Sequence, residues 1–205
     1  MPTLSDDSST RRPRGRPREF DEVPFLDAAI MLFRRRSFSG VSISDITHAT
    51  GLTAGSLYKA YKDKEGLFAK ALARYIEQRE VSLRERLDQA KDGKSKIAEL
   101  LRAYVALSQG KDGKLGCMVV AGVIDLEQLG AASEVLSRQL DRRRAMLEAL
   151  IMEGCHDESI PAHIDCRAAA GVLLALLQGM RVVAKASTLT DDGEAFVRRA
   201  LKLLE

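Results

Sequence analysis

Apolar residues along most of the chain recur at intervals of three and four positions, the spacing that places them on one face of an α-helix. The first such stretch follows Asp21, which can cap a helix, and it ends before Gly40. No stretch of useful length alternates between apolar and polar residues, as a half-buried strand would. The pattern therefore predicts an all-α protein of about nine helices.

Two short helical segments follow the first one, and the first of these begins at a residue suited to capping. Ser42 can cap the first segment while Asp45, three residues further on, bonds back to it in a capping box. Gly51 ends that segment, a second one covers 54–61, and Asp63 caps a longer helix. Two short amphipathic helices joined by a tight turn, after a longer bracing helix, are typical of a helix-turn-helix. The pattern predicts a three-helix domain of this kind.

The rest of the chain is predicted to form a helical bundle. Stretches that contain Gly or Pro separate its expected helices, which cover 96–109, 115–128, 132–154, 165–186 and 192–204.

A helix-turn-helix inserts the start of its second helix into the major groove of DNA. Leu57 should face inward and hold this helix in place. The residues expected near base edges are Thr53, Ala54, Gly55, Ser56 and Lys59. Phosphate contacts position a protein without reading sequence, and the residues expected to make them are Ser42, Tyr58, Tyr61 and Lys64.

The segment 41–68, with Gly-Ser-Leu-Tyr at 55–58 and Lys-Asp-Lys-Glu-Gly-Leu at 62–67, resembles the DNA-binding signature of the TetR family of transcription regulators. The resemblance covers residues 23–72. It departs from the family at 59–61, where Lys-Ala-Tyr replaces the more frequent His-Tyr-Phe. This leaves the contact at Ala60 open, and it suggests an unusual base preference because Lys59 is a natural donor to guanine O6 and N7.

The resemblance implies a homodimeric regulator, usually a repressor, whose divergent C-terminal domain binds a small-molecule effector and dimerises through its last two long helices. Its expected partner is double-stranded DNA with a palindromic operator, because a two-fold dimer presents its reading helices about 34 Å apart. We expect a disordered basic arm over 1–19, a helix-turn-helix domain over 20–80, and an effector-binding and dimerisation domain over 81–205.

Charge adds a second candidate DNA contact. The formal net charge is +3, and the whole excess lies in residues 1–80, where an arginine cluster occupies 11–18. The sequence Arg14-Gly15-Arg16-Pro17 resembles the core of an AT-hook, whose arginines enter the narrow minor groove of A·T tracts. We expect Arg14 and Arg16 to bind there. A merely solvated arm is the alternative.

The expected effector site lies between helices of the C-terminal bundle, where small ligands commonly bind. Its candidate residues are Tyr104, Met118, Val123, Leu173, Leu177 and Gln178. The first five are more often ordinary core residues, and Gln178 and Arg181 are equally suited to contacts between subunits. Segment 165–186 is apolar on more than one face, and Gly171, Ala175 and Gly179 repeat every four residues, which allows close approach of a second helix.

The cysteines and histidines raise two further hypotheses. Cys155, His156, His163 and Cys166 could supply four zinc ligands, but their spacing matches no common zinc pattern. We therefore expect no metal and no cofactor. A redox sensor, through Cys117 or a Cys155–Cys166 pair, is weighed against plain packing of buried thiols.

Other function classes find little support in the sequence. It has no continuous apolar run of transmembrane length and no secretory leader, and its cysteines are sparse, so we expect a cytoplasmic protein without a membrane partner. It contains no nucleophile elbow, metal-ligand helix or phosphate loop, so we expect no enzyme. A purely architectural DNA binder is disfavoured because the C-terminal region is neutral and exceeds 100 residues.

Overall fold

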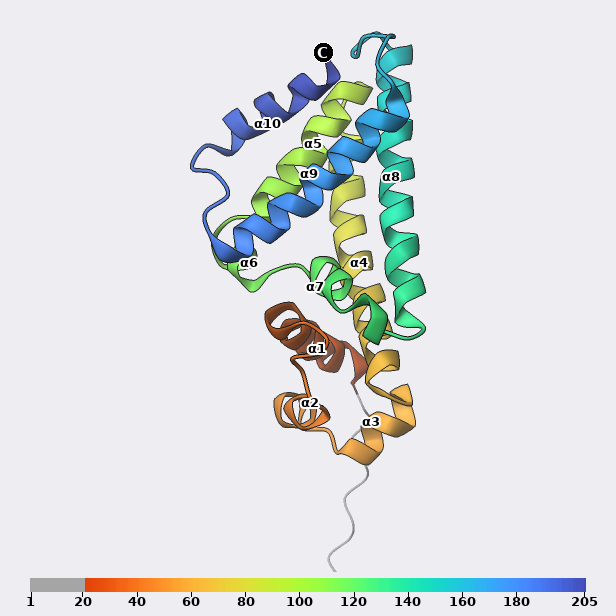
Figure 1. Cartoon of the computed structure of the whole chain (residues 1–205), viewed down its shortest axis with the longest axis vertical. Helices are drawn as coiled ribbons and strands as arrows, with labels where there is room; N and C mark the ends of the chain where they lie inside the picture. Colours follow the sequence, from red (N-terminus) through yellow and green to blue (C-terminus); the bar gives the residue numbers. More distant parts are fainter. Residues whose placement is uncertain (1–20) are drawn as a thin grey trace, which may run out of the picture.

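The computed structural model describes residues 21–205, and all the regular secondary structure within them is helical (Figure 1). It contains α1 (Glu22–Arg36), α2 (Ile43–Thr50), α3 (Ala54–Tyr61), α4 (Lys64–Asp88), α5 (Gly93–Leu107), α6 (Gly110–Leu115), α7 (Met118–Ile124), the 3-10 turn η1 (Leu126–Gln128), α8 (Ala132–His156), α9 (Cys166–Ala186), α10 (Gly193–Leu201) and the 3-10 turn η2 (Lys202–Leu204). The prediction of an all-α protein is confirmed.

The N-terminal helices begin where the sequence predicts, because each has a side chain that satisfies an otherwise unpaired backbone N–H. Asp21 accepts from the amide of Val23 at the start of α1. Ser42 and Asp45 form the expected capping box, with distances of 2.9 and 3.1 Å in the two directions. Asp63 caps α4 in the same way through its bond to Gly66.

The structure corrects the single helix predicted over 115–128. That segment divides into the end of α6, then α7, then η1. The break falls at Gly116, whose φ of 91° lies in the left-handed region that favours glycine. Helix α5 also begins earlier than predicted, at Gly93, because Asp92 caps it by accepting from Ser95.

Two apolar cores hold the helices together. The first core packs α1, α2, α3 and the first half of α4 around residues such as Phe33, Leu57 and Phe68, and it includes Met118 and Leu136 from α7 and α8. The second core is formed by the rest of α4 with α5, α8, α9 and α10. The helix-turn-helix therefore rests directly on the bundle through α7 and the start of α8.

Helix α4 connects the two cores without interruption. It starts beside α3 at one end of the molecule and continues alongside α8 into the bundle (Figure 1). Leu72 and Tyr75 belong to the first core, whereas Leu83 and Leu87 belong to the second. The domain boundary expected at residues 80 and 81 thus falls inside one continuous 25-residue helix.

Helix α9 packs one face into the second core and leaves another apolar face exposed. Val172, Val182 and Val183 are 51%, 54% and 44% exposed. Of the helices in residues 21–205, α9 alone is long and apolar enough to cross a membrane by length and composition. The sequence analysis found no such helix because it looked for an uninterrupted run of apolar residues. Helix α9 has no such run, since Arg181 interrupts its apolar sequence.

Candidate DNA interface and ligand cavity

The turn between α2 and α3 has the geometry of a helix-turn-helix. Gly51 ends α2 in the left-handed conformation, with φ of 72°, and Thr53 starts α3 by accepting from the amide of Ser56 at 3.2 Å. Ile46 and Leu57 are fully buried on the inner faces of the two helices. This packing fixes the orientation of α3 relative to α2.

The opposite face of α3 is exposed to solvent and suits insertion into a groove. Every residue expected near base edges is exposed, namely Thr53, Ala54, Gly55, Ser56 and Lys59. A side chain added at Gly55 would meet open space. Ser42 and Tyr58, two of the residues expected at phosphates, are exposed on the same domain. The N-terminal half of α3 therefore exposes only small residues, and Lys59 adds a basic side chain in the last turn of the helix.

Tyr61 and Lys64 do not point outward as expected. Tyr61 is only 5% exposed, its ring stacks on Phe25 at 5.4 Å, and its hydroxyl donates to Glu22 at 3.2 Å. Burial and the neighbouring Glu22 raise the pKa of the Tyr61 hydroxyl. It faces inward because its position, four residues after Leu57, falls on the buried side of α3.

Lys64 braces the loop that precedes α2. Its Nζ donates to the carbonyl oxygens of Phe38 and Val41, each at 3.0 Å, and lies 4.0 Å from the centre of the Phe38 ring. The carbonyl of Phe38 also accepts from the backbone amide of Val41 at 3.3 Å, so Lys64 adds a second bond there. The two other residues predicted to bind DNA, Arg14 and Arg16, lie outside the described residues.

A cavity of about 360 Å³ lies between α4, α5, α8, α9 and the α6–α7 segment. Of the residues predicted for an effector site, Tyr104 and Gln178 line it. Three others instead fill the two cores with full burial, namely Met118, Leu173 and Leu177. Val123 is 45% exposed at the surface. Sequence periodicity identified these four as inward-facing or apolar but could not show which inward positions border empty space.

The residues that the sequence interpretation missed are the charged groups of this cavity. Arg79, Arg143, Glu80 and Asp112 line it, together with Arg181, for which the sequence left ligand contact and subunit contact equally open. Arg79 had a signal in the sequence, because it follows Tyr75 by four positions and precedes Leu83 by four on the inner face of α4. An arginine within an apolar stripe at helical spacing indicates a buried polar site.

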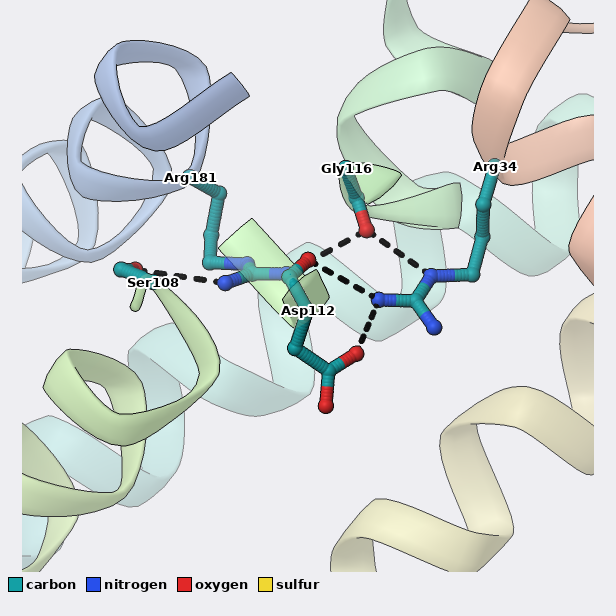
Figure 2. A network of polar contacts seen from close by, with 5 residues as sticks. All are labelled: Arg34, Ser108, Asp112, Gly116 and Arg181. Carbon is teal, nitrogen blue, oxygen red and sulfur yellow. Dashed lines mark hydrogen bonds and ion pairs between the residues drawn. The ribbon is translucent and has the colours of Figure 1, made fainter. Parts of the chain in front are cut away.

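Three elements distant in the sequence meet at the break between α6 and α7 (Figure 2). The carbonyl oxygen of Gly116 accepts from Arg34 Nε of α1 at 2.8 Å and from Arg181 of α9 at 3.2 Å. The carboxylate of Asp112 accepts from the same Arg34 at 2.5 Å. Lys185 of α9 adds a bond to the carbonyl of Arg34. The end of α1 is thereby tied to helices that border the cavity.

Charge and burial have opposite effects on the pKa of Asp112. Burial favours its protonated form, but the hydrogen bond from Arg34 and the positive charges of Arg34, Arg79 and Arg181 outweigh burial and lower its pKa. The carboxylate is therefore ionised at neutral pH and accepts from Arg34 in its charged form, which makes a stronger hydrogen bond.

The cysteines occupy two separate places. Cys117 is half-buried at the start of α7 and lines the cavity. Burial is the main cause that raises the pKa of Cys166, and its interaction with the neighbouring Cys155 raises it further. The zinc site weighed from the sequence has no counterpart in the structure, because residues 21–205 contain no group of three or more His, Cys, Asp and Glu placed to hold a metal ion.

Comparisons with known proteins agree with this geometry. Residues 25–71 match the family model "Bacterial regulatory proteins, tetR family", and residues 93–202 match "Tetracyclin repressor-like, C-terminal domain". The HTH-type transcriptional repressor ComR of Escherichia coli is 30% identical over 178 residues, which is 85% of this chain and 84% of ComR. BdcR, a second HTH-type transcriptional repressor of that organism, is 31% identical over 53% of this chain and 55% of its own length.

A solved structure extends the likeness to a complex with DNA. A cysteine mutant of the TetR family transcriptional regulator CifR, complexed with 26-base-pair operator DNA, has a TM-score of 0.82 and 32% sequence identity. The match covers 93% of this chain and 100% of that one. Fold and site together define a helix-turn-helix DNA-binding transcription regulator with a C-terminal helical domain. The chain belongs to the TetR family.

Proposed function

We propose that this regulator is a repressor that binds a palindromic operator as a homodimer and leaves it when a small-molecule effector binds the C-terminal domain. The exposed, small-residue N-terminal face of α3, held by the fully buried Leu57, is the observation that carries the proposal. The names of ComR and BdcR as repressors support the sign of regulation. The operator complex of CifR supports the kind of DNA site.

Within this proposal the residues of the reading surface divide by role. Thr53, Ala54, Gly55 and Ser56 allow the end of α3 to approach the base edges closely, because none of them has a long side chain. Lys59 donates to guanine O6 or N7. Ser42 and Tyr58 contact phosphates and set the orientation of the domain on the duplex.

The proposed dimer forms through α8 and α9. Val172, Val182 and Val183 expose apolar surface on α9, and a partner can cover it. Gly171 and Gly179 have open space where a side chain would be, so a second helix can approach closely. Replacing Val182 with Arg should yield monomers in sedimentation experiments, because a charge cannot be buried unpaired in such an interface. An unchanged dimer would contradict this arrangement.

Effector release follows from the contacts at the break between α6 and α7. Asp112 lines the cavity and also holds Arg34 at the end of α1. A ligand that moves Asp112 or Arg181 changes the bonds that position α1, and with it the helix-turn-helix. By linkage, the ligand then weakens DNA binding by the same factor by which DNA weakens ligand binding.

Two further elements belong to the same proposal. The arginines at positions 14 and 16 add minor-groove contacts beside the operator half-site, as the arms of homeodomains do. The protein acts in the cytoplasm, where bacterial DNA is found, and it performs regulation and no catalysis. Removal of residues 1–19 should lower both the DNA affinity and its dependence on salt.

The first test is selection of bound sequences from random duplex DNA, with Lys59→Ala and Lys91→Ala in parallel. Lys91 has the same charge and an 85% exposed side chain, and it lies between α4 and α5, so the whole length of α4 separates it from α3. We expect a palindrome for the wild type and Lys91→Ala, and relaxed preference at one symmetric position for Lys59→Ala. Enrichment of A·T-rich DNA without a palindrome would overturn the proposal in favour of an architectural role.

A further inference from the structure

The cavity described above has more buried positive charge than the protein neutralises. Arg181 is only 2% exposed, and its hydrogen bonds go to the hydroxyl of Ser108 and to the backbone carbonyls of Asp112 and Gly116. No carboxylate lies within ion-pair distance of it among residues 21–205. Buried guanidinium groups are normally paired with an acid, because an unpaired buried charge is costly.

Arg79 is a second cation without an acid in contact. Its guanidinium stacks over the ring of Tyr75 at 3.6 Å, and its Nε is buried without a hydrogen-bond partner. Burial is the main cause that lowers the pKa of Arg79. Arg143 differs, because it is paired with Glu80. Around Asp112, therefore, Arg34, Arg79 and Arg181 share a single carboxylate, whose closest ion pair is to Arg34.

The remaining wall of the cavity is largely apolar. Ile76, Leu83, Leu107 and Leu140 line it from α4, α5 and α8. Its volume of about 360 Å³ is at the lower end of the range for small-molecule sites. An arginine pair at one part of such a cavity matches a ligand with a planar anionic head, and the apolar wall matches a hydrocarbon body.

We propose that the cavity binds a small organic carboxylate, with its head between Arg79 and Arg181 and its hydrocarbon body against Leu83, Leu107 and Leu140. This inference rests on the proposed function for its regulatory consequence but not for the binding itself. The carboxylate supplies the missing negative charge. It also competes with the backbone carbonyl of Asp112 for Arg181, at the point where Arg181 and Arg34 share the carbonyl of Gly116 (Figure 2).

The binding test uses the full-length protein without DNA. Its thermal unfolding is measured with benzoate, phenylacetate and octanoate, with the primary amide of each, and with inorganic phosphate at equal ionic strength. We expect at least one carboxylate to raise the Tm in a saturable manner while its amide does not, because a ligand that binds only the folded state stabilises it. Equal shifts by acid and amide, no shift by any acid, or a shift by phosphate alone would overturn the proposal.

Variants distinguish a ligand site from a structural cluster. Arg79→Met should weaken carboxylate binding by about tenfold or more, the loss expected for one charge-assisted hydrogen bond. Without ligand, the Tm of this variant should equal or exceed that of the wild type, because an unpaired charge has been removed. A lower Tm would indicate that Arg79 is structural. Arg138→Met, on the exposed part of α8, is the matched control and should bind as the wild type does.

Operator release separates this inference from the proposed function. A carboxylate that binds and also releases the selected operator supports both. Carboxylate binding without release supports the ligand class and contradicts the effector mechanism. Release by neutral compounds, with no carboxylate bound, supports the effector mechanism and overturns the ligand class.

Discussion

The helix caps of the helix-turn-helix join groups that are near neighbours in the sequence, whereas the charged groups around the cavity are buried and have partners far away in the sequence. Ser42 and Asp45, which cap α2, are three positions apart. Arg34 and Asp112, which join the two halves of the molecule, are separated by 78 positions. The first region is built from local signals over a dry core. The second exists only after six helices, α4 to α9, have met.

The difference follows from what each region must do. The helix-turn-helix has to present one rigid face to DNA, so its helices are capped and its inner face is apolar. In the proposed mechanism the cavity has to change its contacts when occupied, and the carbonyl of Gly116, which Arg34 and Arg181 share, is where such a change reaches α1. Each of the following changes tests one side of this contrast.

The largest effect on stability is expected in the core of the helix-turn-helix. Leu57→Ala removes a fully buried side chain and should lower the free energy of unfolding by about 2–5 kcal/mol, measured by urea denaturation. Its neighbour Tyr58 is 48% exposed, so Tyr58→Ala should change stability by less than about 0.5 kcal/mol. Similar midpoints for the two variants would show that α3 is not held by its inner face.

The junction between the regions should give an intermediate effect. In a double-mutant cycle, Arg34→Met and Asp112→Asn should show a coupling energy of about 1–2 kcal/mol, because Arg34 is buried while Asp112 remains half exposed. The exposed pair of Arg138 and Glu134 is the control and should show less than about 0.5 kcal/mol. Equal coupling in both pairs would mean that the junction contributes no more than a surface contact.

A smaller effect on stability, of opposite sign, is expected near the start of α3. Gly55→Ala adds a methyl group in open space on α3 and should raise the free energy of unfolding by about 0.5–1 kcal/mol through helix propensity. The same methyl group should weaken operator binding, because it meets the DNA. A variant that is more stable and binds DNA as the wild type does would show that this face of α3 does not approach the bases closely.

The smallest effect concerns acid. Asp27 of α1 accepts two hydrogen bonds from Arg74 of α4, at 2.8 and 3.0 Å, and these lower its pKa below the ordinary value. A lowered folded-state pKa gives stability that is fully present at neutral pH and is lost as the pH falls below about 4 toward the folded-state pKa.

Because Asp27 is half exposed, its contribution should stay below about 1 kcal/mol. Unfolding curves measured between pH 6 and pH 3, a window set by the ordinary aspartate pKa of about 4, should show a shallower acid loss for Asp27→Asn than for the wild type. Parallel curves would assign the acid dependence to other carboxylates.

The accuracy of sequence interpretation followed this same division. The capping residues of α1, α2 and α4 and the inward position of Leu57 were predicted correctly, since each depends on neighbours within four positions. Tyr61 was assigned to DNA by family position, although its spacing from Leu57 already placed it on the inner face. Met118, Leu173 and Leu177 were correctly placed inside the protein but not at the cavity.

By itself the sequence determined the helical class, the position of the helix-turn-helix and the side of α3 that faces outward, because caps, glycines and apolar spacing act through the local backbone. Only the tertiary structure decided that Arg79 and Arg181 approach one carboxylate, that the cavity lies beside them, and that Gly116 joins α1 to α9. Electrostatic balance in a buried site depends on distances in space between residues remote in the chain, and helical periodicity contains no information about those distances.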